Sequence, residues 1–193
     1  MLRRLRAAPV RHADCVARIV SGESLVYVAA GSNVAPIENL RRALDVLDRC
    51  FSPLTVSGAY ANAAVGFEGE DFINLVIGFT TDLPLRQVIE RLHEAEAACG
   101  RERAAPKWAP RAMDLDILLF GDLVCAEPGV TLPRPDLLRR PYMLWPAAEI
   151  APDLVHPTEH RTLAELWREL RAAQPHEMRP VELGWRSHHR GGA

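Results

Sequence analysis

The most informative part of the sequence is KWAPRAMDLDILLFG, residues 107–121. It begins as a proline-containing segment and continues into an apolar run that predicts a buried strand. Asp114 and Asp116 interrupt this run two residues apart. Successive side chains of a strand point to opposite faces, so both carboxylates share one face, with Leu115 and Ile117 on the other. Two like charges at this spacing repel each other, and burying them without a partner is costly.

A divalent cation with oxygen ligands would resolve the repulsion between the two carboxylates. Mg²⁺ typically takes one or two carboxylates together with water and phosphate oxygens. Cationic side chains just upstream would neutralise the remaining charge of a polyphosphate. They are Arg101, Arg103, Lys107 and Arg111. The alternative is an ordinary strand end that faces water, which is the usual meaning of an Asp-x-Asp pair. The apolar context MDLDILLF favours the interpretation as a metal site over a strand end that faces water.

The same stretch resembles the signature of the 6-hydroxymethyl-7,8-dihydropterin pyrophosphokinase family of folate biosynthesis. That signature is a basic residue, a spacer, a small residue, Pro-Arg, two further residues and then Asp-apolar-Asp. The matching residues are Lys107, Ala109, Pro110, Arg111, Asp114 and Asp116. The resemblance extends from about Leu25 to about Trp167, with VAAGSN near its start and YMLWPAAEIAPDLVHP near its end.

The resemblance implies an α+β fold, a ferredoxin-like sandwich in which helices flank a central antiparallel sheet. The expected order of strand, helix, strand, strand, helix and strand is also typical of the α+β class. The implied reaction transfers the β,γ-diphosphoryl group of ATP to 6-hydroxymethyl-7,8-dihydropterin and releases AMP. Asp114 and Asp116 would hold two Mg²⁺ ions, and Arg103 and Arg111 would neutralise charge on the transferred group.

Phe72 and Asn74 stand two residues apart on a predicted strand and therefore share a face. An aromatic ring beside an amide can stack on a flat heterocycle and hydrogen-bond to it. From the residues alone, a cross-strand aromatic beside a satisfied Asn is the simpler interpretation. The resemblance assigns the pterin to this pair. It implies further pterin-binding residues at Asn62, Val65, Trp108 and Tyr142.

The resemblance also implies a nucleotide side of the site. Its residues would be His93, Glu96, Arg101, Ile117, Thr131, Arg134 and Arg140. Glu96 falls within the apolar stripe of a helix predicted over 84–99, so its carboxylate needs a partner. That partner is either a nearby Arg, or a metal-bound water or Arg that the carboxylate orients. His93 lies at the edge of the stripe, where an ordinary half-exposed His fits as well as a nucleotide ligand.

Two places depart from the family pattern. Asn62-Ala63-Ala64 replaces a Thr-Pro-Pro type of sequence. Arg134-Pro135 stands where the family usually has His followed by an aromatic or Pro-like residue. These departures leave open a related diphosphokinase that acts on a different pterin or heterocycle. A non-catalytic nucleotide-binding module of the same shape is a second alternative.

The chain of 193 residues is long enough for one domain with a sizeable core. A net charge of −2 does not indicate a broad nucleic-acid-binding surface, and no apolar run approaches a membrane span. Its four cysteines form no C-x-x-C, which favours free thiols in a reducing cytoplasm. We therefore expect a cytoplasmic monomer that acts on small molecules.

The expected organisation is a flexible, Arg-rich extension over 1–24, the pyrophosphokinase domain over 25–174 and a disordered tail over 175–193. Apolar periodicity predicts the elements of the domain. We expect strands at 25–30, 54–60 and 72–80, helices at 36–50, 84–99 and 143–150, a hairpin at 123–132, and a helix that begins at the capping box Thr162 to Glu165. The segments 61–71 and 101–112 have loop compositions, and we expect them to close over the substrates.

Overall fold

The structure is a computed structural model that describes residues 22–62, 71–100, 112–127, 129–174 and 176–187. Its first half contains β1 (Ser24–Ser32), α1 (Pro36–Phe51), β2 (Thr55–Val56), β3 (Ala59–Asn62), β4 (Phe72–Thr81) and α2 (Leu85–Ala98). Its second half contains β5 (Asp114–Phe120), β6 (Cys125–Glu127), β7 (Val130–Leu132), the 3-10 helix η1 (Pro135–Leu138), α3 (Pro141–Ile150), α4 (Leu163–Ala173) and β8 (Arg179–Val181). The strand expected over 54–60 is divided into β2 and β3.

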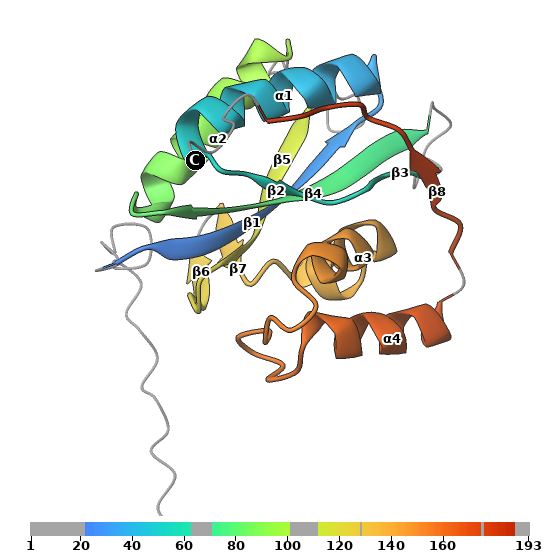
Figure 1. Cartoon of the computed structure of the whole chain (residues 1–193). Helices are drawn as coiled ribbons and strands as arrows, with labels where there is room; N and C mark the ends of the chain where they lie inside the picture. The colour runs from blue at the N-terminus through green and yellow to red at the C-terminus, as the bar shows by residue number, and fades with distance from the viewer. Residues whose placement is uncertain (1–21, 63–70, 101–111, 128, 175, 188–193) are drawn as a thin grey trace, which may run out of the picture.

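The main sheet has the strand order β5-β1-β4-β3-β8, and β2 also pairs with β4. All of these pairings are antiparallel. Helices α1 and α2 cover one face of the sheet, and α3 and α4 lie on the other face (Figure 1). With β2 and β3 counted as one interrupted strand, the chain from β1 to β5 follows the β-α-β-β-α-β order of a ferredoxin-like fold. The predicted α+β sandwich is thus confirmed, and β6 and β7 form the predicted hairpin beside it.

Each face of the sheet has its own apolar core, and β1 shows how the sequence supplies both. Val26, Val28 and Ala30 are buried in the core beneath α1 and α2. Tyr27 and Ala29 alternate with them and are buried in the core beneath α3 and α4. A strand buried on both faces reads as a continuous apolar run, as LVYVAA does.

Local signals position the ends of two helices where the sequence predicts them. Gly100 has φ of +80° directly after α2, a conformation that closes a helix and suits glycine. At the start of α4, the Thr162 hydroxyl accepts a hydrogen bond from the Glu165 N–H, and the Glu165 carboxylate accepts one from the Thr162 N–H. Both orphan donors of this capping box are therefore satisfied.

The C-terminal segment 176–187 is part of the fold, so the expectation of a disordered tail over 175–193 is wrong for this range. β8 adds a strand to the sheet beside β3, and the chain then crosses over α1 (Figure 1). The indole N–H of Trp185 donates a hydrogen bond of 2.8 Å to Asp45 on α1. Alternating apolar side chains pack against the core beneath α1 and stabilise this crossing. They are Val181, Leu183 and Trp185.

Two further features of the described residues concern the cysteines and the length of the helices. Cys50, Cys99 and Cys125 are free thiols. Within the described ranges, the helices are too short or too polar to span a membrane.

Candidate active site

Asp114 and Asp116 lie on β5 at one edge of the sheet, with β1 as neighbour. Asp114 pairs with Gly31 and Asp116 with Ala29. Residues in register across antiparallel strands share a face, and Ala29 belongs to the core beneath α3. Both carboxylates therefore point to the α3 side, as the sequence predicts, whereas Leu115 is buried in the core beneath α1 and α2.

The carboxylate of Asp116 faces an arginine. Its Oδ2 lies 2.9 Å from Nη2 of Arg134, and the two side chains are 25% and 33% exposed. The backbone N–H of Arg134 donates to the carbonyl of Leu118, which fixes the arginine beside β5. The charge of the pair is thus partly balanced by a half-buried guanidinium group.

Further charges continue this contact toward α3. Nε of Arg134 lies 3.6 Å from Oδ2 of Asp136, whose Oδ1 lies 3.9 Å from Nε of Arg140. Asp116, Arg134, Asp136 and Arg140 therefore form a row of alternating charge. Both arginines were predicted from the sequence, whereas Asp136 was not. The position of Asp136 four residues before Arg140 could have indicated this contact, because residues four apart are neighbours on a helical turn.

Three of the predicted pterin residues, Asn62, Phe72 and Asn74, lie together on the same face of the sheet. Asn74 pairs with Gly31, and its side-chain NH₂ donates to Oδ1 of Asn62 at 2.5 Å. Phe72 pairs with Asn62, two residues from Asn74, so its ring shares this face. Because Gly31 pairs with both Asn74 and Asp114, the amide and the carboxylate lie in one row, two strand spacings or roughly 10 Å apart.

Gly31 makes this row possible. A Cβ atom at this position would lie 2.6 Å from Oδ1 of Asn74, which is closer than carbon and oxygen can approach without displacement. The amide of Asn74 therefore lies directly over the backbone of β1. Gly31 belongs to the VAAGSN stretch of the sequence, and its missing side chain leaves the space that this amide fills.

Tyr142 brings a second aromatic ring to this end of the sheet from the first turn of α3. Its side chain is half-buried against the core beneath α3. Burial raises the pKa of Tyr142, with smaller contributions from the surrounding charges. Those charges belong to Arg140, Asp136, Asp116 and Arg134. The tyrosine hydroxyl therefore lies within the electrostatic reach of Asp116.

Glu96 reaches β5 from the other side, that of α2. It is 5% exposed, and its Oε1 accepts a hydrogen bond of 2.9 Å from the backbone N–H of Leu115. One partner of this carboxylate is thus a backbone amide between the two aspartates. Of the other predicted nucleotide residues, His93 is half-buried on α2, Ile117 packs against the core beneath α1 and Thr131 is exposed on β7.

Some predicted site residues fall outside the described residues, so their positions stay predictions. They are Val65, Arg101, Arg103, Trp108 and Arg111. On the α3 side of the sheet, the structure brings together the acidic pair, the described pterin residues and two arginines. They are Asp114, Asp116, Asn62, Phe72, Asn74, Tyr142, Arg134 and Arg140.

The donor atoms around Asp114 and Asp116 fit magnesium. Among the described residues, no group of three or more His, Cys, Asp or Glu side chains is arranged to hold a metal by itself. Two carboxylates on one face suit a hard cation that completes its coordination with water and phosphate oxygens. Structural zinc, in contrast, takes four protein ligands that are usually Cys and His.

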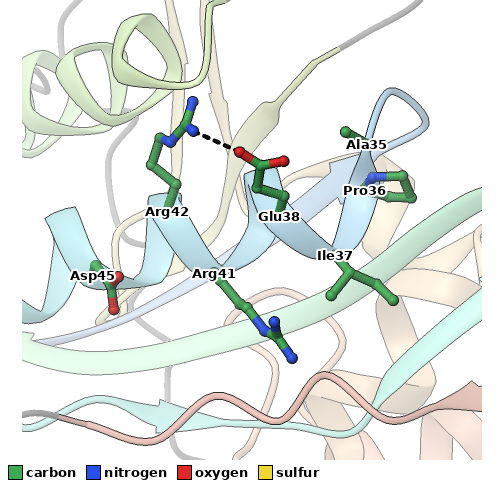
Figure 2. A pocket seen from close by; sticks show the side chains of 7 residues that line it. All are labelled: Ala35, Pro36, Ile37, Glu38, Arg41, Arg42 and Asp45. Atoms are coloured by element: carbon green, nitrogen blue, oxygen red, sulfur yellow. Dashed lines mark hydrogen bonds and ion pairs between the residues drawn. The ribbon is translucent and has the colours of Figure 1, made fainter.

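A surface hollow of about 700 Å³ lies along the first half of α1 (Figure 2). Its lining residues are Ala35, Pro36, Ile37, Glu38, Arg41, Arg42 and Asp45. An ion pair of 2.8 Å joins Arg42 to Glu38 at its rim. Helix α1 covers the face of the sheet opposite to the acidic pair, and none of the predicted site residues lines the hollow. We therefore place the candidate site at the acidic pair.

Comparison with known families gives one consistent result. The family model described as 7,8-dihydro-6-hydroxymethylpterin-pyrophosphokinase (HPPK) matches residues 27–152. This range contains the whole row from Asn74 to Asp114 and ends before the C-terminal segment 176–187.

Curated relatives carry the same description. The 2-amino-4-hydroxy-6-hydroxymethyldihydropteridine pyrophosphokinase of Pseudomonas aeruginosa is 37% identical over 149 residues, which cover 73% of this chain and 88% of that protein. The enzyme of the same name from Aquifex aeolicus is 32% identical over 142 residues, which cover 72% of this chain and 88% of that protein.

Among solved structures, the fold is similar to Plasmodium falciparum HPPK-DHPS wild type with STZ-DHP, with a TM-score of 0.62 and 11% identity. The match covers 82% of this chain and 43% of that one, so this chain spans less than half of the solved protein. At this identity the likeness shows the fold alone. The family model and the curated relatives together show that the chain belongs to the 7,8-dihydro-6-hydroxymethylpterin-pyrophosphokinase family.

Proposed function

We propose that this chain is a 2-amino-4-hydroxy-6-hydroxymethyldihydropteridine diphosphokinase of folate biosynthesis. It transfers the β,γ-diphosphoryl group of ATP to the hydroxymethyl group of 6-hydroxymethyl-7,8-dihydropterin and releases AMP. The observation that carries this proposal is the row in which Asn74 and Asp114 flank Gly31. The row supports the proposal because an amide that can bind a heterocycle and a carboxylate that can bind a metal lie at a separation that one small substrate can bridge.

The pterin ring binds over the β3 and β4 end of the row. Phe72 and Tyr142 supply aromatic faces from two different elements, and Trp108 adds a third. The amides of Asn62 and Asn74 hydrogen-bond to the polar edge of the ring. Because Asn74 and Asn62 already hold each other at 2.5 Å, the amides are oriented before substrate binds. Val65 completes the pterin side.

The triphosphate binds over the β5 end. Asp114 and Asp116 would hold two Mg²⁺ ions, which would supply positive charge to the triphosphate and favour ionisation of the attacking hydroxyl group. Arg103 and Arg111 neutralise charge that develops on the transferred group, and Arg134 and Arg140 lie on the same side. The other residues that the resemblance assigns to the nucleotide side are His93, Glu96, Arg101, Ile117 and Thr131. Of these, Glu96 and Ile117 lie on the α2 side of β5, opposite to the acidic pair. Position and charge supply the catalysis, without a strong base.

One assay tests the reaction directly. The purified chain is incubated with ATP, Mg²⁺ and 6-hydroxymethyl-7,8-dihydropterin, and the products are identified by mass spectrometry. We expect AMP and the pterin diphosphate in equal amounts. Formation of ADP with a pterin monophosphate, or of no pterin product, would contradict the proposal.

A second candidate function, transfer to a different pterin or heterocycle, is motivated by Asn62-Ala63-Ala64 and Arg134-Pro135. A panel of reduced pterins with AMP release as the readout separates the two candidates. A non-catalytic module would bind ATP and Mg²⁺ in calorimetry yet release no AMP with any member of the panel. We further propose that the protein acts as a cytoplasmic monomer, which light scattering of the purified chain tests for oligomeric state.

A further inference from the structure

The contact between Arg134 and Asp116 occupies an oxygen atom that a metal would use. Nη2 of Arg134 lies 2.9 Å from Oδ2 of Asp116. Mg²⁺ binds carboxylate oxygens at about 2.0–2.1 Å in a nearly octahedral shell. A guanidinium group and a divalent cation on one carboxylate repel each other. Metal binding at Asp116 is therefore disfavoured while Arg134 stays in contact with Oδ2.

The side chain of Arg134 is held weakly enough to move. Its Nε is one of the two buried side-chain polar atoms that lack a hydrogen-bond partner within the described residues. Its ion-pair contact with Oδ2 of Asp136 spans 3.6 Å, which is too long for a hydrogen bond. A guanidinium group with an unused donor gains hydrogen bonds by turning to a phosphate, which it can bind with two parallel N–H groups.

The surroundings of Arg134 allow the side chain to turn without the loss of its anchor. Its backbone N–H donates to Leu118 at 2.9 Å, so the residue stays beside β5 when the side chain moves. Asp136 also has Arg140 at 3.9 Å, so its carboxylate keeps a positive neighbour after Arg134 leaves. The contact with Asp116 is the one that a bound metal would replace.

We propose that Arg134 is the resident counterion of Asp116 in the nucleotide-free protein and transfers to a phosphate oxygen when Mg²⁺ arrives with ATP. This inference rests on the proposed function, because it assigns the metal to Asp116. Its consequence is that nucleotide and metal binding are coupled. Metal alone must displace the guanidinium group without compensation, whereas metal bound to a triphosphate supplies the group with a new partner. By linkage, the metal favours the nucleotide by the same factor.

Binding of Mn²⁺, followed by the loss of the free Mn²⁺ signal in electron paramagnetic resonance, tests this coupling without turnover. Titrations are made with the full chain, alone and with α,β-methylene-ATP. Arg134→Gln should bind Mn²⁺ alone about tenfold more tightly than the wild type, and the gain in Mn²⁺ affinity on adding nucleotide should shrink by a similar factor. Arg134→Lys retains a cation and should lie between the two.

Two further variants serve as controls. Arg139→Gln removes the same charge from an exposed position beside η1 and should leave both Mn²⁺ affinities within about twofold of the wild type. Asp116→Asn should weaken Mn²⁺ binding. The inference is overturned if Arg134→Gln and Arg134→Lys bind Mn²⁺ as the wild type does while Asp116→Asn weakens it. If Asp116→Asn has no effect, the metal site and the inference both fail. Absence of AMP in the turnover assay would reject the proposed function alone.

Discussion

On the α2 side of β5, Glu96 accepts a hydrogen bond of 2.9 Å from the backbone N–H of Leu115, whereas on the α3 side Asp116 faces the guanidinium group of Arg134 at the same distance. The backbone amide is fixed in the strand and cannot leave its carboxylate. The guanidinium group ends a flexible side chain and can be replaced. Two carboxylates beside one strand thus have contacts of different kinds, one with a fixed backbone amide and one with a side chain that can move.

The two helical layers also differ. The α1 and α2 layer is closed by its helices and by the C-terminal segment that crosses α1 (Figure 1). In the α3 and α4 layer, the core contains Ala29 and Val76, but the next row of the sheet carries Gly31, Asn74 and Asp114. Apolar packing stops where the polar row begins, and the candidate site lies at this boundary.

The largest effect should come from the acidic pair. Asp114→Asn or Asp116→Asn preserves volume but removes a negative ligand, so we expect diphosphate transfer to fall by about 10³-fold or more. The thermal midpoint should change little, because neither side chain belongs to an apolar core. AMP release and thermal unfolding measure the two quantities. Asp122→Asn in the exposed turn after β5 is the control, and near-normal turnover of either site variant would remove the metal assignment.

The closed layer should depend on its C-terminal cover. Trp185→Ala removes apolar contact with the core beneath α1 and the hydrogen bond to Asp45, so the free energy of unfolding should fall by about 2 kcal/mol. Trp185→Phe retains most of the packing and should lose about half as much. Urea titration measures both changes. If both variants match the wild type, the segment does not stabilise the protein.

Glu96 tests the contrast between the two carboxylates most directly. Glu96→Leu leaves the buried N–H of Leu115 without this acceptor, and the free energy of unfolding should fall by about 2 kcal/mol. Glu96→Gln keeps an acceptor oxygen and should retain most of the stability. Should Glu96→Gln instead abolish turnover at unchanged stability, the carboxylate would act on the metal or nucleotide, as the sequence analysis allowed.

Gly31→Ala should separate the two ends of the polar row. The added Cβ would lie 2.6 Å from Oδ1 of Asn74 and must displace the amide. We expect the KM for the pterin to rise about tenfold, with a much smaller change in the KM for ATP, because a misplaced amide weakens one set of hydrogen bonds. Steady-state kinetics with each substrate varied in turn measure this. Asn74→Ala should reproduce the pattern, and equal changes in both KM values would count against it.

The smallest effect is expected in the segment that joins α3 and α4. His156 is 1% exposed, and its Nδ1 accepts hydrogen bonds from the backbone N–H groups of Thr158 and Glu159. Burial lowers the pKa of His156 below its ordinary value of 6.5. The unfolded chain therefore binds the proton more readily than the folded protein does. The stability that comes from the buried, neutral His156 is complete above the ordinary pKa and is lost as the pH falls through the folded pKa.

Urea titrations should show that the free energy of unfolding is lower at about pH 5 than at about pH 7, by about 1 kcal/mol. His156→Asn retains an acceptor and should show less pH dependence, whereas His160→Gln at an exposed position should keep it. Hydrogen exchange should place the loss in α3 and α4 before α1 and α2. The same pH dependence in His156→Asn would assign the effect to other groups.

Much of the fold could be predicted because its signals are local. The capping box of Thr162 and Glu165 and the turn at Gly100 depend on residues a few positions apart. The shared faces of Asp114 with Asp116, and of Phe72 with Asn74, follow from the two-residue period of a strand. The alternation of Val181, Leu183 and Trp185 was an equally local signal for the C-terminal segment, but polar neighbours and the short strand concealed it.

The sequence by itself determined the order of elements, the acidic pair and its common face, since periodicity and backbone geometry act within a few residues. Only the tertiary structure decided which partner each carboxylate has. Arg134 and Asp116 are brought together across the edge of the sheet, and Glu96 meets Leu115 because α2 packs against β5. Gly31 likewise lies between Asn74 and Asp114 only in the register of three strands. Such contacts join residues distant in the chain, so their geometry arises from packing and strand pairing.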